Sequence, residues 1–269
     1  GAGKSLCYQI PAIISNYKTI IVSPLIALID DQVNSLSQFG VNVSKIHSNQ
    51  SIEENHISLQ RFINGTCKII YVSPEKLMSE KMLQIIKELD IGLIVIDEIH
   101  CVSKWGQSFR PDYERLSILN KYFPKTVLAG FTATADKTTK QDILDKIYEG
   151  SATIYSKGFD RPNLSLSVLL KKDWKSQLLN IVESRKNLSG IIYCLSRSKT
   201  EEVSDLLNKK GFNTDAYHAG LDSVIRKNIQ NKFMTERGHV IVATIAFGMG
   251  IDKPDIRYVI HLNMPNSME

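Results

Sequence analysis

The sequence predicts an α/β protein of two lobes, each a mostly parallel sheet flanked by helices. Short β-rich runs alternate with longer amphipathic stretches, which is the pattern of parallel strands covered by helices. The 269 residues exceed one typical domain. The alternation breaks at a turn-rich segment, residues 158–163, and then resumes. We therefore expect a first lobe at residues 1–158, a connection at 159–164 and a second lobe, incomplete at its C-terminal end, at 165–269.

Individual elements follow from local patterns. An amphipathic helix is expected from about Leu25 to Gln38, with Gly40 beyond its end, and the Ser51 and Glu54 pair has the spacing of a capping box. A second capping box is expected at residues 198–201, opening a helix that ends before Gly211. The predicted strands are 19–23, 43–46, 68–72, 93–96 and 126–131 in the first lobe, and 164–170, 190–194, 215–218, 240–244 and 258–261 in the second.

Composition narrows the class of protein. Hydrophobic residues make up 43% of the chain, enough to fill two cores. No apolar run approaches the ~20 residues needed to span a bilayer, and the first residues do not form a signal peptide. The four cysteines are scattered without a C-x-x-C pair, which favours reduced thiols in an intracellular protein over disulfides or a zinc site. The net charge of +5 permits a polyanionic partner without requiring one.

The chain opens with part of a phosphate-binding loop. Gly1, Ala2, Gly3, Lys4 and Ser5 match the second half of G-x-x-x-x-G-K-[ST]. Small residues let backbone amides wrap phosphates, the lysine reaches the β- and γ-phosphates, and the hydroxyl is a magnesium ligand. Five residues alone are also compatible with a flexible glycine-rich start.

A pair of carboxylates strengthens this interpretation. A buried strand run, residues 91–96, ends directly in Asp97 and Glu98. Ligands bind at the carboxyl ends of parallel strands, and adjacent carboxylates there are costly unless solvated or bound to a metal. We expect Asp97 to hold Mg²⁺ and Glu98 to orient or deprotonate the attacking water. The plain alternative is a solvated turn.

The segment that follows carries a specific resemblance. Residues 97–113, DEIHCVSKWGQSFRPDY, resemble the DEAH box and aromatic-rich loop of the RecQ family of DNA helicases. Further segments resemble that family in order: LCYQIPA (6–12), VSPL (22–25), YVSPE (71–75), FTATA (131–135), FDRPNL (159–164), YCLSR (193–197), YHAGL (217–221) and ATIAFGMGIDKP (243–254). Position 99 is Ile where the family commonly has Ala, so we expect a packing change there.

The resemblance implies two RecA-like lobes that use ATP and Mg²⁺, translocate three-prime to five-prime on single-stranded DNA and unwind duplexes. Single-stranded and forked DNA are the implied partners. It implies an intracellular protein, cytoplasmic and nucleoid-associated in a bacterium or nuclear in a eukaryote. It assigns DNA contacts to Ser23, Pro24, Ser73, Trp105, Phe109, Arg110, Arg197, His218 and Thr244, nucleotide contact to Asp252, and nucleotide-to-DNA coupling to His100, Thr132 and Thr134.

Elementary chemistry supports some of these assignments. Trp105 and Phe109 beside Arg110 combine stacking faces with a cation, as single-strand binders do. Ser23 and Thr244 follow strands, where a hydroxyl or amide could hold a phosphate; capping the backbone is an equal alternative from position alone. Histidines at such positions are more often structural than catalytic.

Two alternatives stay open: an RNA-directed helicase, and a nucleotide-switched clamp that binds nucleic acid without unwinding it. The sequence starts inside the phosphate loop and stops before the family's arginine finger. We therefore expect residues 1–269 alone to hydrolyse ATP weakly, since such a finger is worth several orders of magnitude in rate.

Overall fold

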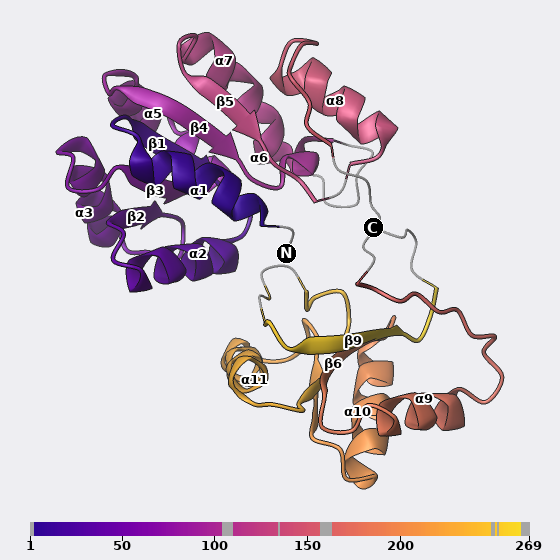
Figure 1. The fold of residues 1–269 in the computed structure, drawn as a ribbon. Coiled ribbons are helices and arrows are strands. Elements are labelled where there is room, and N and C mark those ends of the chain that lie inside the picture. Colours follow the sequence, from indigo (N-terminus) through magenta and orange to yellow (C-terminus); the bar gives the residue numbers. More distant parts are fainter. Residues whose placement is uncertain are drawn as a thin grey trace. The chain divides into compact units, whose positions relative to one another are not determined.

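The computed structural model describes residues 3–103, 110–133, 135–156, 163–248, 251 and 253–264. The chain divides into two compact units, Gly1–Ser156 and Lys157–Glu269, which we call the first and second lobes (Figure 1). None of the helices in the described residues is long and apolar enough to cross a membrane.

The first lobe is built on a parallel sheet. Its strands are β1 (Lys18–Val22), β2 (Val43–Ile46), β3 (Ile69–Val72), β4 (Ile91–Ile96) and β5 (Val127–Gly130), in the order β2-β3-β1-β4-β5. Alternate side chains enter two separate cores: Ile20 and Val22 face one, Ile21 the other. Because both faces are covered, the inner strands are nearly continuous Val and Ile runs.

Helices connect and cover these strands. They are α1 (Lys4–Ile14), α2 (Ile26–Gln38), α3 (Ile52–Ile63), α4 (Pro74–Leu77), α5 (Glu80–Lys87), α6 (Pro111–Glu114), α7 (Leu119–Tyr122) and α8 (Lys137–Ile147), with 3₁₀ turns η1 (Ile99–Val102) and η2 (Arg115–Ile118). The predicted capping box is confirmed: the Ser51 hydroxyl accepts the Glu54 N–H at 3.1 Å, and the Glu54 carboxylate accepts the Ser51 N–H at 2.7 Å. Gly40, with φ of +78°, follows α2 as predicted.

The second lobe repeats the same topology. Its strands are β6 (Ser189–Tyr193), β7 (Thr214–Tyr217), β8 (Val240–Ala243) and β9 (Ile256–His261), all parallel, in the order β7-β8-β6-β9. Helices α9 (Trp174–Glu183), α10 (Arg197–Lys209) and α11 (Ser223–Thr235) accompany them. Counted from each lobe's first strand, both sheets read 2-3-1-4, and the first lobe adds β5 at its edge.

Two local predictions are wrong. Residues 164–170 form no strand, although Leu166 and Val168 alternate as a strand would; both side chains are about four-fifths exposed. A strand exists only where a neighbour supplies hydrogen bonds, and nothing in the described part of the lobe pairs with this segment. Helix α10 begins two residues earlier than expected, because the Ser196 hydroxyl accepts the Lys199 N–H at 3.2 Å and caps it.

Residue 99, where a packing change was expected, lies against β5. Ile99 is buried, and its side chain fills the space over Gly130, where an added Cβ would lie 2.3 Å from the Ile99 Cδ1. The larger residue at 99 is therefore accommodated by a glycine on β5.

Candidate functional site

The first turn of α1 lies against the end of β4. Gly3 has a φ of +70°, so the chain turns directly into the helix at Lys4. The Asp97 N–H donates to the Val22 carbonyl at 2.9 Å, which fixes the strand end. The Lys4 Nζ lies 3.5 Å from Glu98 Oε1. The predicted lysine and the predicted carboxylates, which lie 93 residues apart in the sequence, are thus neighbours in the fold.

Asp97 is a buried carboxylate with a defined set of donors. Its Oδ1 accepts the Glu98 N–H at 3.0 Å, its Oδ2 accepts the Tyr8 hydroxyl at 3.3 Å, and its main-chain carbonyl accepts the Tyr113 hydroxyl at 2.9 Å. Burial and the neighbouring Glu98 charge together raise the pKa of Asp97. This carboxylate would be stabilised by a cation.

Glu98 has the opposite shift. Burial alone would raise its pKa, but the hydrogen bond from His100 and the charge of Lys4 outweigh burial, so the pKa is lowered. Glu98 also has a φ of +49°, in the left-handed region that non-glycine residues rarely adopt. Such backbone strain is concentrated at functional sites. Glu98 is therefore ionised at neutral pH and held in a fixed orientation.

A chain of polar contacts leads away from Glu98. The His100 Nδ1 lies 3.2 Å from Glu98 Oε2 and 2.8 Å from Thr132 Oγ1. Burial opposes the imidazolium, but hydrogen bonds to Cys101 and Glu98 raise the pKa of His100 to about 9. Two of the three residues predicted for coupling are thus in contact, at the ends of β4 and β5. Thr134 lies outside the described residues.

The residues at this site fit a nucleotide with magnesium. Lys4 and the N-terminus of α1 favour phosphate, and the Ser5 hydroxyl and Asp97 carboxylate are oxygen ligands of the kind magnesium prefers. No group of three or more His, Cys, Asp or Glu in the described residues could hold a metal ion. Magnesium needs only one or two protein oxygens when phosphates and water supply the rest. Gly1, Ala2 and Asp252 lie outside the described residues.

The predicted DNA contacts of the first lobe lie at strand ends. Ser23 and Pro24 follow β1, and Ser73 follows β3; all three are buried. The Arg110 guanidinium donates to the Pro24 carbonyl at 2.6 Å, joining two predicted contacts that are 86 residues apart. Trp105 and Phe109 lie outside the described residues.

The serine amides are used within the sheet. The Ser23 N–H donates to the Val72 carbonyl at 3.2 Å, and the Ser73 N–H to the Ile46 carbonyl at 3.1 Å. The Ser73 hydroxyl donates to Glu75 at 2.6 Å, whereas the buried Ser23 hydroxyl has no hydrogen-bond partner among the described residues. These two amides are therefore not available to bind a phosphate. For Ser23, this removes one of the two groups, amide or hydroxyl, that its position after a strand had suggested for phosphate binding.

The predicted DNA contacts of the second lobe also lie beyond the carboxyl ends of parallel strands. Arg197, His218 and Thr244 follow β6, β7 and β8. A Cβ added to Gly220 would lie 2.9 Å from the Arg197 guanidinium and 3.2 Å from the His218 Nδ1, so this glycine lets the two side chains approach. The Thr244 N–H donates to the Tyr217 carbonyl at 3.1 Å.

Sequence reasoning missed a matching feature of the two lobes. His47 follows β2 as His218 follows β7, and each precedes a helix cap by four residues. Both imidazoles are buried and pair through Nε2 with a carboxylate, His47 with Asp30 at 3.2 Å and His218 with Glu201 at 3.1 Å. The repeated spacing of histidine and cap was the available signal.

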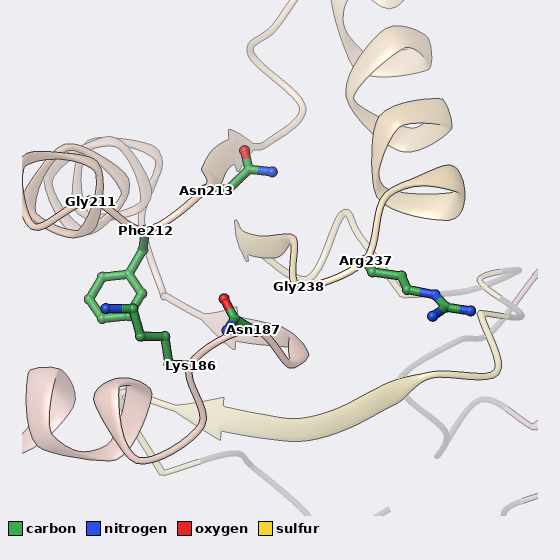
Figure 2. Close-up of a pocket in the computed structure, with 7 residues that line it drawn as sticks. All are labelled: Lys186, Asn187, Gly211, Phe212, Asn213, Arg237 and Gly238. Atoms are coloured by element: carbon green, nitrogen blue, oxygen red, sulfur yellow. The ribbon is translucent and has the colours of Figure 1, made fainter.

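A pocket in the second lobe lies at the opposite ends of the same strands, where the strands begin. Its volume is about 400 Å³, and Figure 2 shows the residues that line it: Lys186, Asn187, Gly211, Phe212, Asn213, Arg237 and Gly238. Asn187, Asn213 and Gly238 lie just before β6, β7 and β8, so the pocket is at the amino ends of these strands. It is separate from the strand-end residues Arg197, His218 and Thr244.

Comparison with protein families identifies the chain. Residues 1–143, more than half of it, match the DEAD/DEAH box helicase family. The chain belongs to this family. Residues 173–269 match the helicase conserved C-terminal domain, so both halves of a DEAD/DEAH box helicase core are present.

Among such helicases the expected resemblance to RecQ is confirmed. The chain is 43% identical over its whole length to the ATP-dependent DNA helicase RecQ of Pasteurella multocida, covering 43% of that protein. It is 38% identical to the ATP-dependent DNA helicase Q1 of Mus musculus, again over 100% of the chain and 43% of the relative. The chain thus spans less than half the length of these relatives.

Solved helicase structures confirm the RecA-like fold. The chain superposes on the DEAD-box helicase Mss116, bound to single-stranded RNA, with a TM-score of 0.71 and 18% identity, covering 98% of this chain and 60% of that one. The match to Mycobacterium smegmatis helicase Lhr, bound to single-stranded DNA, has a TM-score of 0.61 and 17% identity, covering 96% and 37%. At these identities the likeness concerns the fold.

Proposed function

We propose that the chain is the motor core of an ATP-dependent DNA helicase. The motor translocates three-prime to five-prime on single-stranded DNA and unwinds duplexes, forked DNA among them, in recombination, repair or replication. The observation that carries this proposal is the contact chain from Lys4 through Glu98 and His100 to Thr132. It links the start of the phosphate-binding helix to the end of β5, as coupling between nucleotide and DNA requires.

Each residue of the site has a role in hydrolysis. Lys4 and the first turn of α1 would bind the phosphates, and Ser5 and Asp97 would hold Mg²⁺, which would supply positive charge against the phosphates. Glu98, ionised and fixed by His100, accepts a hydrogen bond from the attacking water and orients it. Asp252 contacts the ribose. His100 and Thr132 pass the state of the nucleotide site toward the DNA side, together with Thr134.

Nucleic acid would bind along the strand ends. Arg110, tied to Pro24, and the aromatic residues Trp105 and Phe109 form the first-lobe contact, where bases stack and a cation pairs with phosphate. Arg197, His218 and Thr244 form the second-lobe contact, with Ser23 and Ser73 as additional first-lobe residues. An enzyme acting on chromosomal DNA would work in the nucleoid of a bacterium or the nucleus of a eukaryote.

Substitution of the central residues tests this function. In the intact protein, Lys4→Ala should lose nucleotide binding, whereas Glu98→Gln should bind nucleotide but hydrolyse it at least about 100-fold more slowly. DNA-stimulated ATPase and strand separation are the measurements, with the surface variant Glu88→Gln as the matched control. Retained strand separation by either site variant would contradict the assigned roles.

An RNA-directed helicase is the second candidate, because single strands of RNA and of DNA both carry phosphates and stackable bases. Competition between DNA and RNA strands of matched sequence distinguishes the two, because stimulation of hydrolysis by DNA alone excludes RNA. A clamp without unwinding would bind DNA in a nucleotide-dependent way yet leave duplexes intact. The presence of Lys4, Asp97 and Glu98 together argues against a clamp.

A further inference from the structure

Beneath the nucleotide site lies a buried tyrosine without an assigned role. Tyr8 is on the inner face of α1 and only 1% exposed. Its ring packs edge-on against Phe131, with centroids 5.1 Å apart, and its hydroxyl points away from that contact to Asp97. The ring alone would satisfy the core, so the hydroxyl requires a separate explanation.

The Tyr8 hydroxyl lies beside both oxygen groups that the site offers to magnesium. It donates to Asp97 Oδ2 at 3.3 Å, across 89 residues of sequence. Ser5 lies three residues earlier on α1, and hence on the same helix face as Tyr8. A phenol carries its proton at neutral pH, so the Tyr8 hydroxyl is the donor and the Asp97 carboxylate the acceptor.

Hydrogen-bonded side chains surround Tyr8. Tyr71 on β3 belongs to the same core cluster as Tyr8, and its hydroxyl accepts the Gln9 Nε2 at 2.9 Å. Gln9 also donates to Gln32 Oε1 on α2 at 2.7 Å. Tyr8, Tyr71 and Gln9 are all less than a tenth exposed. The Tyr8 phenol is therefore buried next to side chains that hydrogen bonds hold in place.

We propose, on the basis of the nucleotide site proposed above, that Tyr8 is a positioning residue that holds Ser5 and Asp97 in the arrangement required for magnesium. Tyr8 does not touch substrate or metal. It hydrogen-bonds to one ligand, Asp97 at the end of β4, and shares a helix face with the other, Ser5 on α1. The bonds of Gln9 to Tyr71 and Gln32 join α1 to β3 and α2 next to this phenol. Outer groups of this kind set ligand orientation and metal affinity.

The test is Tyr8→Phe in the intact protein, which keeps the ring contact with Phe131 and removes only the hydroxyl. Binding of a fluorescent ATP analogue is measured across a Mg²⁺ titration, so no turnover is needed. We expect the Mg²⁺ concentration for half-maximal binding to rise about 10- to 100-fold. Binding of the analogue without metal should match the wild type, because Lys4 and α1 are unchanged.

Two further variants separate positioning from general damage. Tyr148→Phe removes another partly buried hydroxyl of the same lobe, one that lies against Gly130, and should leave the Mg²⁺ titration unchanged. In an Asp97→Asn background, Tyr8→Phe should have little additional effect, because its partner has lost the charge through which it acts. Thermal unfolding of each variant checks that the lobe is folded.

The outcomes are distinct. A wild-type Mg²⁺ titration for Tyr8→Phe, an equal shift in Tyr148→Phe, or a full additional effect in the Asp97→Asn background would each overturn the positioning role while leaving the helicase proposal intact. Absence of Mg²⁺-dependent nucleotide binding in the wild-type protein would instead overturn the proposed function, and the role of Tyr8 with it.

Discussion

At the scale of single residues, the two adjacent carboxylates at the end of β4 have pKa values shifted in opposite directions by their surroundings. Asp97 is buried beside a like charge, which raises its pKa, whereas Glu98 is paired with His100 and Lys4, which lower its pKa. The difference suits a metal ligand next to a water-orienting group. It depends on which partners the fold brings to each oxygen.

The His100 and Glu98 pair makes stability depend on pH. Since its pKa is raised from 6.5 to about 9 in the folded protein, the imidazolium contributes fully below pH 6.5 and loses its contribution as pH rises through 9. We expect His100→Ala to cost roughly 2–3 kcal/mol more at pH 6 than at pH 9.5. Urea unfolding at both pH values measures this difference. The exposed His56→Ala is the control, and a gap for His100→Ala that does not change with pH would refute the assignment.

At the scale of elements, the Asp215 carboxylate links α11 to the second-lobe sheet. Asp215 on β7 accepts from the Lys232 Nζ of α11 at 2.8 Å and pairs with His239, just before β8, at 2.9 Å. The nearby His239 imidazole and the Lys232 ammonium lower the pKa of Asp215 to about 2, although burial by itself would raise it. The contact thus joins two strands and a helix.

Asp215→Asn should weaken this junction in a pH-dependent way. A depressed carboxyl pKa stabilises the fold above pH 3.8, and the contribution falls as pH drops toward 2. We expect a loss of about 1–2 kcal/mol near pH 6, discounted because the side chain is 28% exposed, with the gap narrowing between pH 4 and pH 3. Urea titrations at these pH values test it. Asp205→Asn, on the exposed face of α10, should show no such narrowing.

At the scale of the whole molecule, the two lobes have the same fold. Both sheets share the 2-3-1-4 order, and each lobe encloses its own pair of core clusters. Among the described residues each of these clusters draws its side chains from a single lobe. Because each lobe has its own buried core, we expect the lobes to unfold as separate units.

Separate unfolding of the two lobes can be followed with a single tryptophan as a fluorescence probe. Trp105→Phe leaves Trp174, on α9 of the second lobe, as the remaining indole. In that background Ile94→Ala, a truncation in the first-lobe core, should destabilise its lobe by about 2–5 kcal/mol. Circular dichroism should then show an earlier first transition, while the Trp174 fluorescence midpoint stays in place. Equal movement of both midpoints would show that the lobes unfold together.

Much of this protein was determined by the sequence alone. The strands at 43–46 and 93–96, the capping box of Ser51 and the trio Lys4, Asp97 and Glu98 were predicted because each depends on neighbours within a few residues. Parallel alternation then places the carboxyl end of β4 beside the start of α1. The proximity of Lys4 to the carboxylates at the end of β4 could therefore be predicted.

Tertiary structure decided the rest, because it concerns partners distant in sequence. Residues 164–170 have the alternation of a strand, yet only a neighbouring strand could make them one. The bond from Arg110 to Pro24 and that from Tyr8 to Asp97 each span more than 80 residues. Local patterns specify faces and ends of elements, whereas strand order and side-chain packing determine which of those faces and ends meet.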